Sequence, residues 1–285
     1  VSTWQSIYKM RKDYFDQFDL IIGDEAHLFK AKSLTSILEK MTDTKYRFGL
    51  TGTLDGTLTH KLVLEGLFGP VKKVTTTKEL IDNKQLAEFQ IKSLALSYSD
   101  QERKDAVKMT YQQEMDFIVR HEKRNRFIRN LTISQEGNTL LLFQYVEKHG
   151  RGLFDDINSR VGEERKVFFV HGGTDSTDRE EIRRITEQSE NAIIIASYGT
   201  FSTGVNIRNL HNIIFASPSK SRVRNLQSIG RGLRKSETKT AATLYDIVDD
   251  LKWKSKRNFT LEHFLERMKI YNEEKFKVKM YKIDI

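Results

Sequence analysis

The sequence predicts an α/β protein of two domains, each built on a parallel β-sheet. Short apolar runs alternate with amphipathic stretches along most of the chain, a pattern typical of parallel strands joined by crossover helices. The 285 residues exceed the roughly 100 to 200 residues usual for one domain, which indicates two compact units. Because the first domain has only two strand-and-helix units, which make only part of a parallel sheet, we expect it to be incomplete at its N-terminal side.

The first domain begins with two strand-and-helix units. Residues 18–22 (Phe-Asp-Leu-Ile-Ile) are expected to form a buried strand, and residues 33–41 the helix that follows it. Residues 46–50 form the next expected strand, which ends in the turn Thr51-Gly52-Thr53. These two strands make only part of a sheet.

The second domain contains a longer series of strands. An alternating run at residues 89–98 precedes a charged stretch, which we expect to be one helix over about residues 100–132. We therefore divide the chain into residues 1–90 and 91–285. Further strands are expected at residues 139–143, 166–170, 192–196, 212–216 and 243–248. A doubly wound sheet of this kind binds its ligand at the carboxyl ends of its strands.

The composition limits the classes of partner. Lys and Arg number 48 against 39 Asp and Glu, which leaves a net charge of +9 and a pI of about 9.4. This balance favours a polyanionic partner such as nucleic acid. The absence of cysteine excludes disulfides and thiolate metal sites and is typical of a cytoplasmic protein. No apolar run approaches the length of a membrane span, so we expect no membrane partner.

The segment Asp24-Glu25-Ala26-His27 directly follows the first expected strand. At a strand end, one carboxylate can bind Mg²⁺ while its neighbour orients the attacking water, as phosphoryl transfer requires. We assign Asp24 as the metal ligand and Glu25 as the base. An acidic surface loop is the alternative for two adjacent acids alone, but the four residues after an apolar strand favour catalysis.

A second motif lies at residues 227–234 (Gln-Ser-Ile-Gly-Arg-Gly-Leu-Arg) on an expected helix. Arg231 and Arg234 are three residues apart, so on a helix they share one face and both could reach one phosphate. They are candidate arginine fingers, which stabilise transition-state charge. Ordinary exposed arginines are the alternative, but Gln227 and Gly230 at fixed offsets favour a ligand that approaches the helix closely.

Two loops of small and hydroxyl-bearing residues complete the candidate site. Residues 197–206 follow an expected strand and end in Thr203-Gly204-Val205-Asn206, whose amides and hydroxyls can approach phosphates. Thr51-Gly52-Thr53 is placed in the same way after the second strand. Each loop alone equally suits a plain strand-ending turn.

In chain order, these four segments match motifs II, III, V and VI of the superfamily-two helicases, and the chain resembles this family over most of its length. The resemblance implies two RecA-like domains that clamp ATP, with Mg²⁺, between them and move along nucleic acid. The opening residues 2–6 and the turn at residues 50–56 resemble those of helicases that remodel branched DNA. This resemblance implies forked or branched DNA, or RNA–DNA hybrids, as the partner.

The resemblance implies roles for three groups of residues. The catalytic group is Asp24, Glu25, His27, Gln227, Arg231 and Arg234. The group that couples nucleotide state to nucleic-acid binding is Thr51, Gly52 and Thr53. Nucleic-acid contacts are implied for Ser2, Thr3, His171, Gly172 and Thr203.

Two places depart from the family pattern or fit a second interpretation. Gly204 and Asn206 are implied to contact the nucleotide, but the family often has Asp where Asn206 stands, and an amide can hydrogen-bond without adding charge. The His171-Gly172-Gly173 segment resembles a loop that contacts the nucleic-acid backbone, and it equally suits a simple strand-to-helix turn.

The phosphate-cradling pattern Gly-x-x-x-x-Gly-Lys-Ser/Thr occurs nowhere in the sequence. Tight ATP binding by this chain alone is therefore not expected. Because the chain opens on residues that resemble a later motif, at Ser2 and Thr3, we expect it to be part of a longer protein. Its missing N-terminal part would carry the phosphate loop and act as a partner of this chain.

The C-terminal residues 252–282 hold ten Lys or Arg, four Asp or Glu and several aromatic residues. This composition suits a surface that follows a phosphate backbone and stacks bases. The spacing of Phe264, Met268 and Tyr271 also indicates an amphipathic helix docked on the second domain, which we favour.

Three functions fit the sequence. We expect the complete protein to be an ATP-dependent DNA helicase or branch-migration motor of replication, recombination and repair. A double-strand DNA translocase that does not separate strands would use the same motifs. A non-catalytic nucleic-acid-binding module is the third hypothesis, and the missing phosphate loop is its main support.

Overall fold

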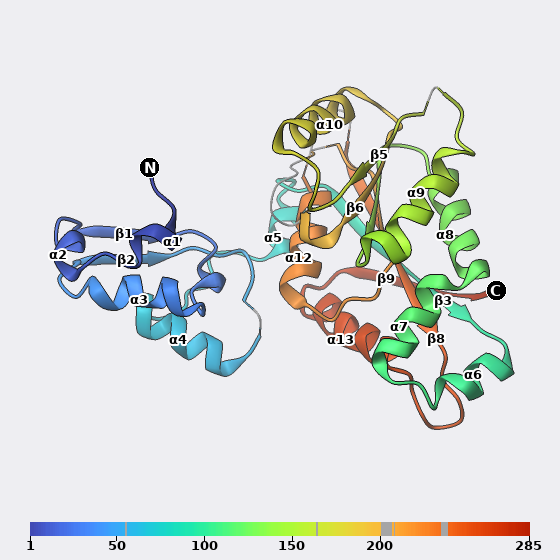
Figure 1. The fold of residues 1–285 in the computed structure, drawn as a ribbon, viewed down its shortest axis with the longest axis horizontal. Helices are drawn as coiled ribbons and strands as arrows, with labels where there is room; N and C mark the ends of the chain where they lie inside the picture. The colour runs from blue at the N-terminus through green and yellow to red at the C-terminus, as the bar shows by residue number, and fades with distance from the viewer. Residues whose placement is uncertain (55, 164, 201–206, 208, 235–238) are drawn as a thin grey trace. The chain divides into compact units, whose positions relative to one another are not determined.

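The computed structural model describes residues 1–285 except 55, 164, 201–206, 208 and 235–238, and except the side chains of residues 222–224, 231 and 232 (Figure 1). The chain divides into a smaller unit, residues 1–74 with 221–223, and a larger unit, residues 75–220 with 224–285. The division that we expected at residue 90 falls inside strand β3 (Glu88–Ser97). Since β3 pairs with two strands of the larger unit, the chain enters that unit earlier than the sequence indicated.

The smaller unit is built on two parallel strands, β1 (Leu20–Gly23) and β2 (Tyr46–Gly49). Helix α3 (Lys32–Lys40) connects them, and it buries Ile37 and Leu38 in two small apolar clusters. A Cβ atom added at Gly23 or Gly49 would lie 2.9 Å from the Phe68 ring, so glycine lets α4 pack across the strand ends. The remaining elements are α1 (Trp4–Ile7), α2 (Lys12–Phe15), η1 (Ala26–Leu28) and α4 (Leu58–Phe68).

The larger unit is built on a seven-stranded sheet in the order β5-β6-β4-β7-β8-β3-β9, and all its pairings are parallel. Besides β3, its strands are β4 (Thr139–Phe143), β5 (Val167–Val170), β6 (Ile193–Ser197), β7 (Asn212–Phe215), β8 (Ala241–Asp250) and β9 (Lys277–Asp284). Its helices include α5 (Thr77–Asp82), α6 (Asp100–Ala106), α7 (Tyr111–Arg120), α8 (Glu122–Ser134), η2 (Val146–Gly150), α9 (Arg151–Asn158), α10 (Ser176–Gln188), α12 (Arg222–Gly232) and α13 (Phe259–Glu273).

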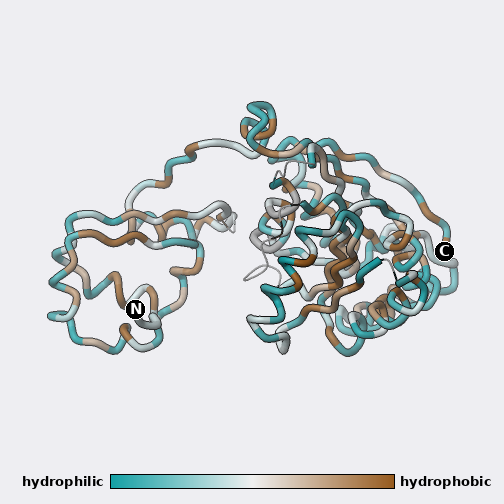
Figure 2. The backbone as a smooth tube through the Cα atoms, turned by 90° about the horizontal axis from the view of Figure 1, so that it is seen from above, coloured by the Kyte–Doolittle hydropathy of each residue, from teal (hydrophilic) through white to brown (hydrophobic). Residues whose placement is uncertain are grey.

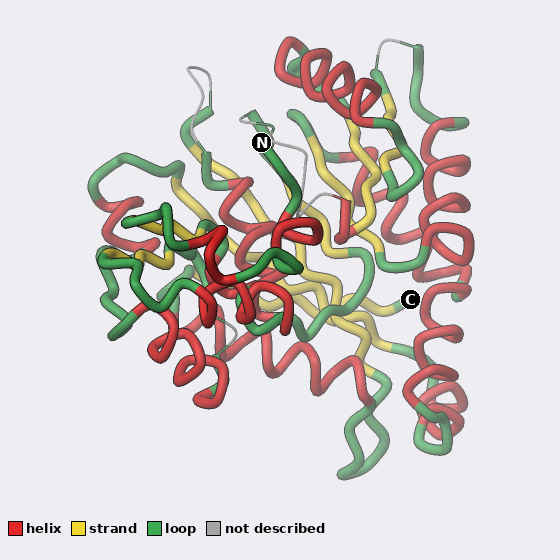
Figure 3. The backbone as a smooth tube through the Cα atoms, turned by 60° about the vertical axis from the view of Figure 1, so that its left-hand side comes forward, coloured by secondary structure: helices red, strands yellow, loops and turns green. Residues whose placement is uncertain are grey.

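Helices cover both faces of this sheet. In Figure 1 the strands lie between one group of helices, α6 to α9, and a second group, α10, α12 and α13, and Figure 3 shows helices on both sides of the strands. Strand β4 is buried along its whole length, with Leu140 and Leu142 in one core and Leu141 and Phe143 in the other. Parallel strands covered on both faces carry such continuous apolar runs, and Figure 2 shows these runs as hydrophobic stretches inside the unit.

Two expectations about helices were wrong in part. The charged stretch at residues 100–132 forms three helices, α6, α7 and α8, because Ser99, Thr110 and His121 each accept a hydrogen bond from a backbone N–H three residues later and start a new helix. The basic C-terminal segment is helical only in α13, where the buried Phe264 and Tyr271 confirm the docked amphipathic helix.

The rest of the C-terminal segment forms β9, a strand that the sequence analysis did not anticipate. It pairs with β3 at the end of the sheet, and Lys277, Lys279 and Lys282 lie along it. Lysines on an edge strand oppose pairing with another chain. Among the described residues, no helix combines the length and apolar character required to cross a membrane.

Candidate functional site

The acidic segment lies where β1 ends in the smaller unit. Asp24 and Glu25 are exposed, and the N–H of Glu25 donates to Asp24 Oδ1 over 2.8 Å. Glu25 adopts the left-handed conformation (φ 49°, ψ 48°), which few residues other than glycine adopt without strain. This turn takes the chain from the strand directly into η1 and leaves both carboxylates at the exposed strand end.

His27 connects the acidic segment to the Thr51-Gly52-Thr53 loop, because the parallel pairing of β1 and β2 makes their carboxyl ends adjacent. His27 is buried, and its Nδ1 lies 3.0 Å from Thr51 Oγ1 and 3.2 Å from Glu25 Oε2. The Thr51 hydroxyl donates to Thr53 O over 3.1 Å. Since that proton is used, His27 Nδ1 is the donor to Thr51. Four residues predicted to belong to the site, Glu25, His27, Thr51 and Thr53, are therefore connected by contacts from the Glu25 carboxylate to the Thr51-Gly52-Thr53 loop.

Asp24 fits a partial Mg²⁺ site. Its carboxylate is exposed, and only Oδ1 receives the Glu25 N–H bond that the structure shows. Mg²⁺ keeps several waters and commonly takes one or two protein carboxylates beside substrate phosphates. The described residues contain no group of three or more His, Cys, Asp or Glu side chains that could hold a metal ion, so Asp24 would share the ion with bound nucleotide.

In the larger unit, β4 lies between β6 and β7 in the sheet. After β4 the chain forms β5 and β6 on one side of it and then crosses to form β7 on the other side. Doubly wound sheets bind ligands at the carboxyl ends of strands where the order reverses in this way. Thr203, Gly204 and Asn206 follow β6 in the sequence and lie outside the described residues.

The loop after β5 closes on itself. The N–H of His171 donates to Thr174 Oγ1 over 3.0 Å, and the N–H of Gly173 donates to His171 Nδ1 over 3.1 Å. Arg179 of α10 donates to Gly172 O over 3.2 Å. These local bonds are those of a strand-to-helix turn, so a nucleic-acid contact here stays a prediction. The other predicted contacts, Ser2 and Thr3, are exposed ahead of α1 in the smaller unit.

Helix α12 carries Gln227 and Arg231, and it buries Ile229 against the sheet. Arg234 follows the helix end at Gly232, so the expectation that Arg234 lies on this helix with Arg231 was wrong. Glycine near a helix C-terminus favours termination there. The side chain of Arg231 lies outside the described residues.

Lys239 contacts the backbone at Arg234, just after the end of α12. It is 1% exposed, and its Nζ donates to Arg234 O over 2.9 Å. Burial lowers the pKa of Lys239 to about 8, because the ammonium loses hydration. The folded chain therefore releases the Lys239 proton at a lower pH than the unfolded chain does.

Replacing Lys239 by methionine is expected to remove a pH dependence of stability. Between about pH 8 and 10 the unfolded chain keeps the Lys239 proton while the folded chain releases it, so the free energy of unfolding rises with pH, by at most about 3 kcal/mol. Urea unfolding at several pH values, followed by Trp253 fluorescence in a Trp4→Phe background, measures the rise. Lys108→Met, at an exposed position, is the control. Parallel pH curves for Lys239→Met and its parent would contradict the expectation.

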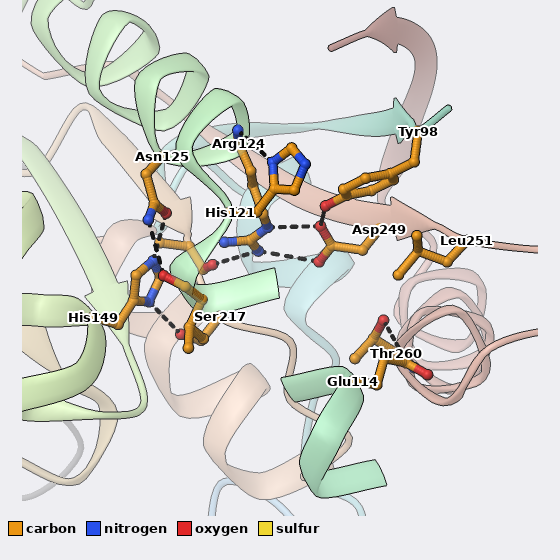
Figure 4. A network of polar contacts seen from close by, with 12 residues as sticks. Tyr98, Glu114, His121, Arg124, Asn125, His149, Ser217, Asp249, Leu251 and Thr260 are labelled. Carbon is orange, nitrogen blue, oxygen red and sulfur yellow. Dashed lines mark hydrogen bonds and ion pairs between the residues drawn. The ribbon is translucent and has the colours of Figure 1, made fainter. Parts of the chain in front are cut away.

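The sequence analysis did not find the buried polar groups of β8. Asp246 and Asp249 are 0% and 1% exposed, and they pair with Arg267 and Arg124 in the same order. Figure 4 shows the second of these pairs. The three acids of β8, Asp246, Asp249 and Asp250, in a mostly apolar strand are the one signal that the sequence offered. Because each buried charge has a partner, neither pair leaves an uncompensated charge in the core.

Comparison with known proteins finds two family matches. Residues 122–236 match the helicase conserved C-terminal domain, and residues 1–56 match the type III restriction enzyme res subunit. The ATP-dependent DNA helicase UvsW of Enterobacteria phage T4 is 35% identical over 298 residues, which cover 100% of this chain and 59% of that protein. The chain therefore spans less than two thirds of the length of this relative.

Two solved structures are similar over 99% of the chain. The crystal structure of T4 UvsW matches with a TM-score of 0.60 and 33% identity over 57% of its own chain. The DNA-bound type ISP restriction-modification enzyme LlaBIII matches with a TM-score of 0.66 and 16% identity over 23% of its chain, which shows the fold alone. These matches confirm the expected pair of RecA-like α/β domains with parallel sheets.

Proposed function

Because the chain belongs to the superfamily-two helicases, we propose that the protein containing it is an ATP-dependent DNA helicase or branch-migration motor. Its proposed substrates are forked or branched DNA, and RNA–DNA hybrids, in replication, recombination and repair. Upstream residues of the same protein would supply the phosphate loop. The proposed setting is the cytoplasm, that of the host if a phage encodes the protein.

The observation that carries the proposal is the position of His27, whose Nδ1 hydrogen-bonds to Thr51 Oγ1 and lies 3.2 Å from Glu25 Oε2. A motor must convert the state of its nucleotide into a change at its nucleic-acid contacts. With Glu25 orienting the attacking water, His27 contacts both that carboxylate and the loop of Thr51. A change in charge at the nucleotide therefore has a short path to the loop, which a binding module without hydrolysis would not need.

The other predicted residues take defined roles in this proposal. Asp24 would hold Mg²⁺, and the ion would supply charge stabilisation for the phosphates. Arg231 and Arg234 stabilise the transition-state charge, and Gln227 places an amide beside the phosphates. Gly204 and Asn206 are proposed to contact the nucleotide. Nucleic-acid contacts are proposed for Ser2, Thr3, His171, Gly172 and Thr203.

Two assays on the full-length protein separate the proposed motor from its alternatives. ATP-dependent displacement of a strand from a forked duplex is the expected result for a helicase. Displacement of a triplex-forming strand without unwinding of the fork would indicate the double-strand translocase. Binding of DNA without any stimulated ATP hydrolysis would leave the non-catalytic module.

The chain of 285 residues, by itself, is expected to bind DNA weakly and to show no ATPase activity above background. Its Lys and Arg side chains displace counterions from DNA, so the affinity should fall steeply between roughly 50 and 200 mM salt. Hydrolysis also needs the phosphate loop. Filter binding across a salt series and a phosphate-release assay measure the two properties. DNA-stimulated phosphate release that Glu25→Gln abolishes would show that an unrecognised loop of this chain holds the phosphates.

A further inference from the structure

Residues 216–219, in the segment between β7 and α12, form a buried loop. Ala216 and Ser217 are 0% exposed, and Ser219 is 6% exposed. Connecting segments normally lie on the surface, because a buried loop must find partners for its peptide groups inside the protein. Here the partners are side chains from several other elements.

Arg124 of α8 reaches this segment from one face of the sheet. Its Nε and Nη2 donate to the two oxygens of Asp249 over 2.6 and 3.1 Å, and Nη2 also donates to Ala216 O over 2.7 Å (Figure 4). The Tyr98 hydroxyl donates to Asp249 Oδ1 over 2.6 Å. Burial and the adjacent carboxylate raise the pKa of Tyr98, so this hydroxyl stays a donor.

Arg267 of α13 repeats the arrangement on the opposite face. Its Nε and Nη2 donate to Asp246 over 2.9 and 2.8 Å, and its Nη1 donates to Ser219 O over 3.1 Å. The Tyr271 hydroxyl donates to Asp246 Oδ2 over 2.9 Å. Asp246 and Asp249 are an odd number of positions apart on one strand, so their side chains point to opposite faces. On each face of β8, one aspartate thus accepts hydrogen bonds from an arginine and a tyrosine. Each arginine also donates to a backbone carbonyl of the loop between β7 and α12.

Ser217 lies in the chain between Ala216 and Ser219, whose carbonyls accept from the two arginines, and both its hydroxyl and its own carbonyl have partners. Its hydroxyl oxygen accepts the Gln144 N–H over 3.1 Å and lies 3.2 Å from His149 Nδ1, while its carbonyl accepts the Tyr198 hydroxyl over 2.9 Å. The other nitrogen of His149 lies 3.1 Å from Asn125 Oδ1 (Figure 4). Burial, with the charge of Arg124, lowers the pKa of His149 well below its usual value. A neutral ring therefore donates to Asn125 and accepts from Ser217.

The same loop is tied to α12. Asn225, in the first turn of that helix and fully buried, donates to Ser219 O over 3.2 Å, so it shares this acceptor with Arg267. If Ser219 O moves, Asn225 must move with it or lose this hydrogen bond, so the start of the helix that carries Gln227 and Arg231 is displaced.

We infer that Arg124 and Arg267 are positioning residues that set the placement of α12 by holding the carbonyls of Ala216 and Ser219 from opposite faces of the sheet. The inference rests on the proposed role of Arg231 as an arginine finger. A misplacement of about 1 Å at such a group can lower the rate by about 10²-fold. Lysine cannot replace arginine here, because it lacks the fork that binds a carboxylate and a carbonyl together.

The test is a double-mutant cycle in the full-length protein. Arg124→Lys is expected to lower kcat for DNA-stimulated ATP hydrolysis by about 10 to 10²-fold with little change in KM for ATP, and to lower it no further in an Arg231→Ala background. Arg267→Lys should behave in the same way. Arg129→Lys is the matched control, since Arg129 lies on the same helix but pairs with Asp156. An equal loss in both backgrounds would mean that Arg124 is merely structural and would overturn the inference.

Hydrogen exchange on the chain of 285 residues keeps the inference separate from the proposed function. In Arg124→Lys, amides of residues 216–230 should exchange about tenfold faster or more, while those of β4 and β6 keep their rates. Unchanged exchange at residues 216–230 would overturn the positioning role whatever the enzyme does. Faster exchange there, together with full turnover in Arg231→Ala, would instead keep the positioning role and remove the proposed finger.

Discussion

Arg231→Ala in the full-length protein is expected to lower DNA-stimulated ATP hydrolysis by about 10³ to 10⁵-fold, the range associated with an arginine finger. The guanidinium is proposed to meet negative charge that develops only in the transition state, so DNA binding and folding should change little. A malachite-green phosphate assay with saturating DNA measures the rate, and thermal unfolding measures the folded fraction. The same substitution at Arg234 is expected to abolish most of the stimulated turnover as well.

Arg183→Ala is a suitable control for both variants. Arg183 lies on α10 and forms ion pairs with Glu180 and Glu187 on the same helix, so its loss removes one positive charge without touching α12. A variant of Arg231 that melts early but keeps its activity per folded molecule would show that this arginine is structural.

Glu25→Gln is expected to lower ATP hydrolysis by about 10²-fold or more while ATP and DNA binding stay nearly intact, because the amide cannot accept the proton of the attacking water. The glutamine is nearly isosteric, and its carbonyl oxygen can occupy the same position 3.2 Å from His27 Nδ1. The substitution therefore separates the chemical role of the carboxylate from its contact with His27. Single-turnover hydrolysis beside equilibrium binding of labelled ATP provides the comparison.

Glu39→Gln, on the exposed face of α3 in the same unit, controls for the loss of one negative charge. Wild-type turnover in Glu25→Gln would remove this residue from the mechanism. A large loss of ATP binding would instead assign the carboxylate to nucleotide or metal binding.

Local features of the sequence were sufficient to predict most of the strands. Apolar runs such as residues 139–143 and 192–196 predict buried parallel strands because a sheet covered on both faces requires no polar alternation. The family motifs could also be identified from the sequence, because each occupies a few consecutive residues and most follow such a strand. The composition of Asp24-Glu25-Ala26-His27 and of residues 227–234 therefore indicated the chemistry before any fold was known.

Two elements were predicted wrongly, for different reasons. Residues 277–284 form a strand because they pair in parallel with β3, which lies far away in the chain, and nothing local to residues 277–284 specifies that pairing. The stretch at residues 100–132 was read as one helix because its charge pattern is continuous. Three capping residues divide it, and they act through a few backbone N–H groups.

By itself, the sequence determined the α/β class, the order of the motifs and the residue types available for phosphate chemistry. Only the tertiary structure decided which of these residues touch: His27 with Thr51, and Arg124 and Arg267 with the carbonyls that precede α12. The physical reason is that apolar periodicity is a local property of the chain, whereas a buried hydrogen bond is decided by which distant donor and acceptor the packed strands bring within about 3 Å of each other.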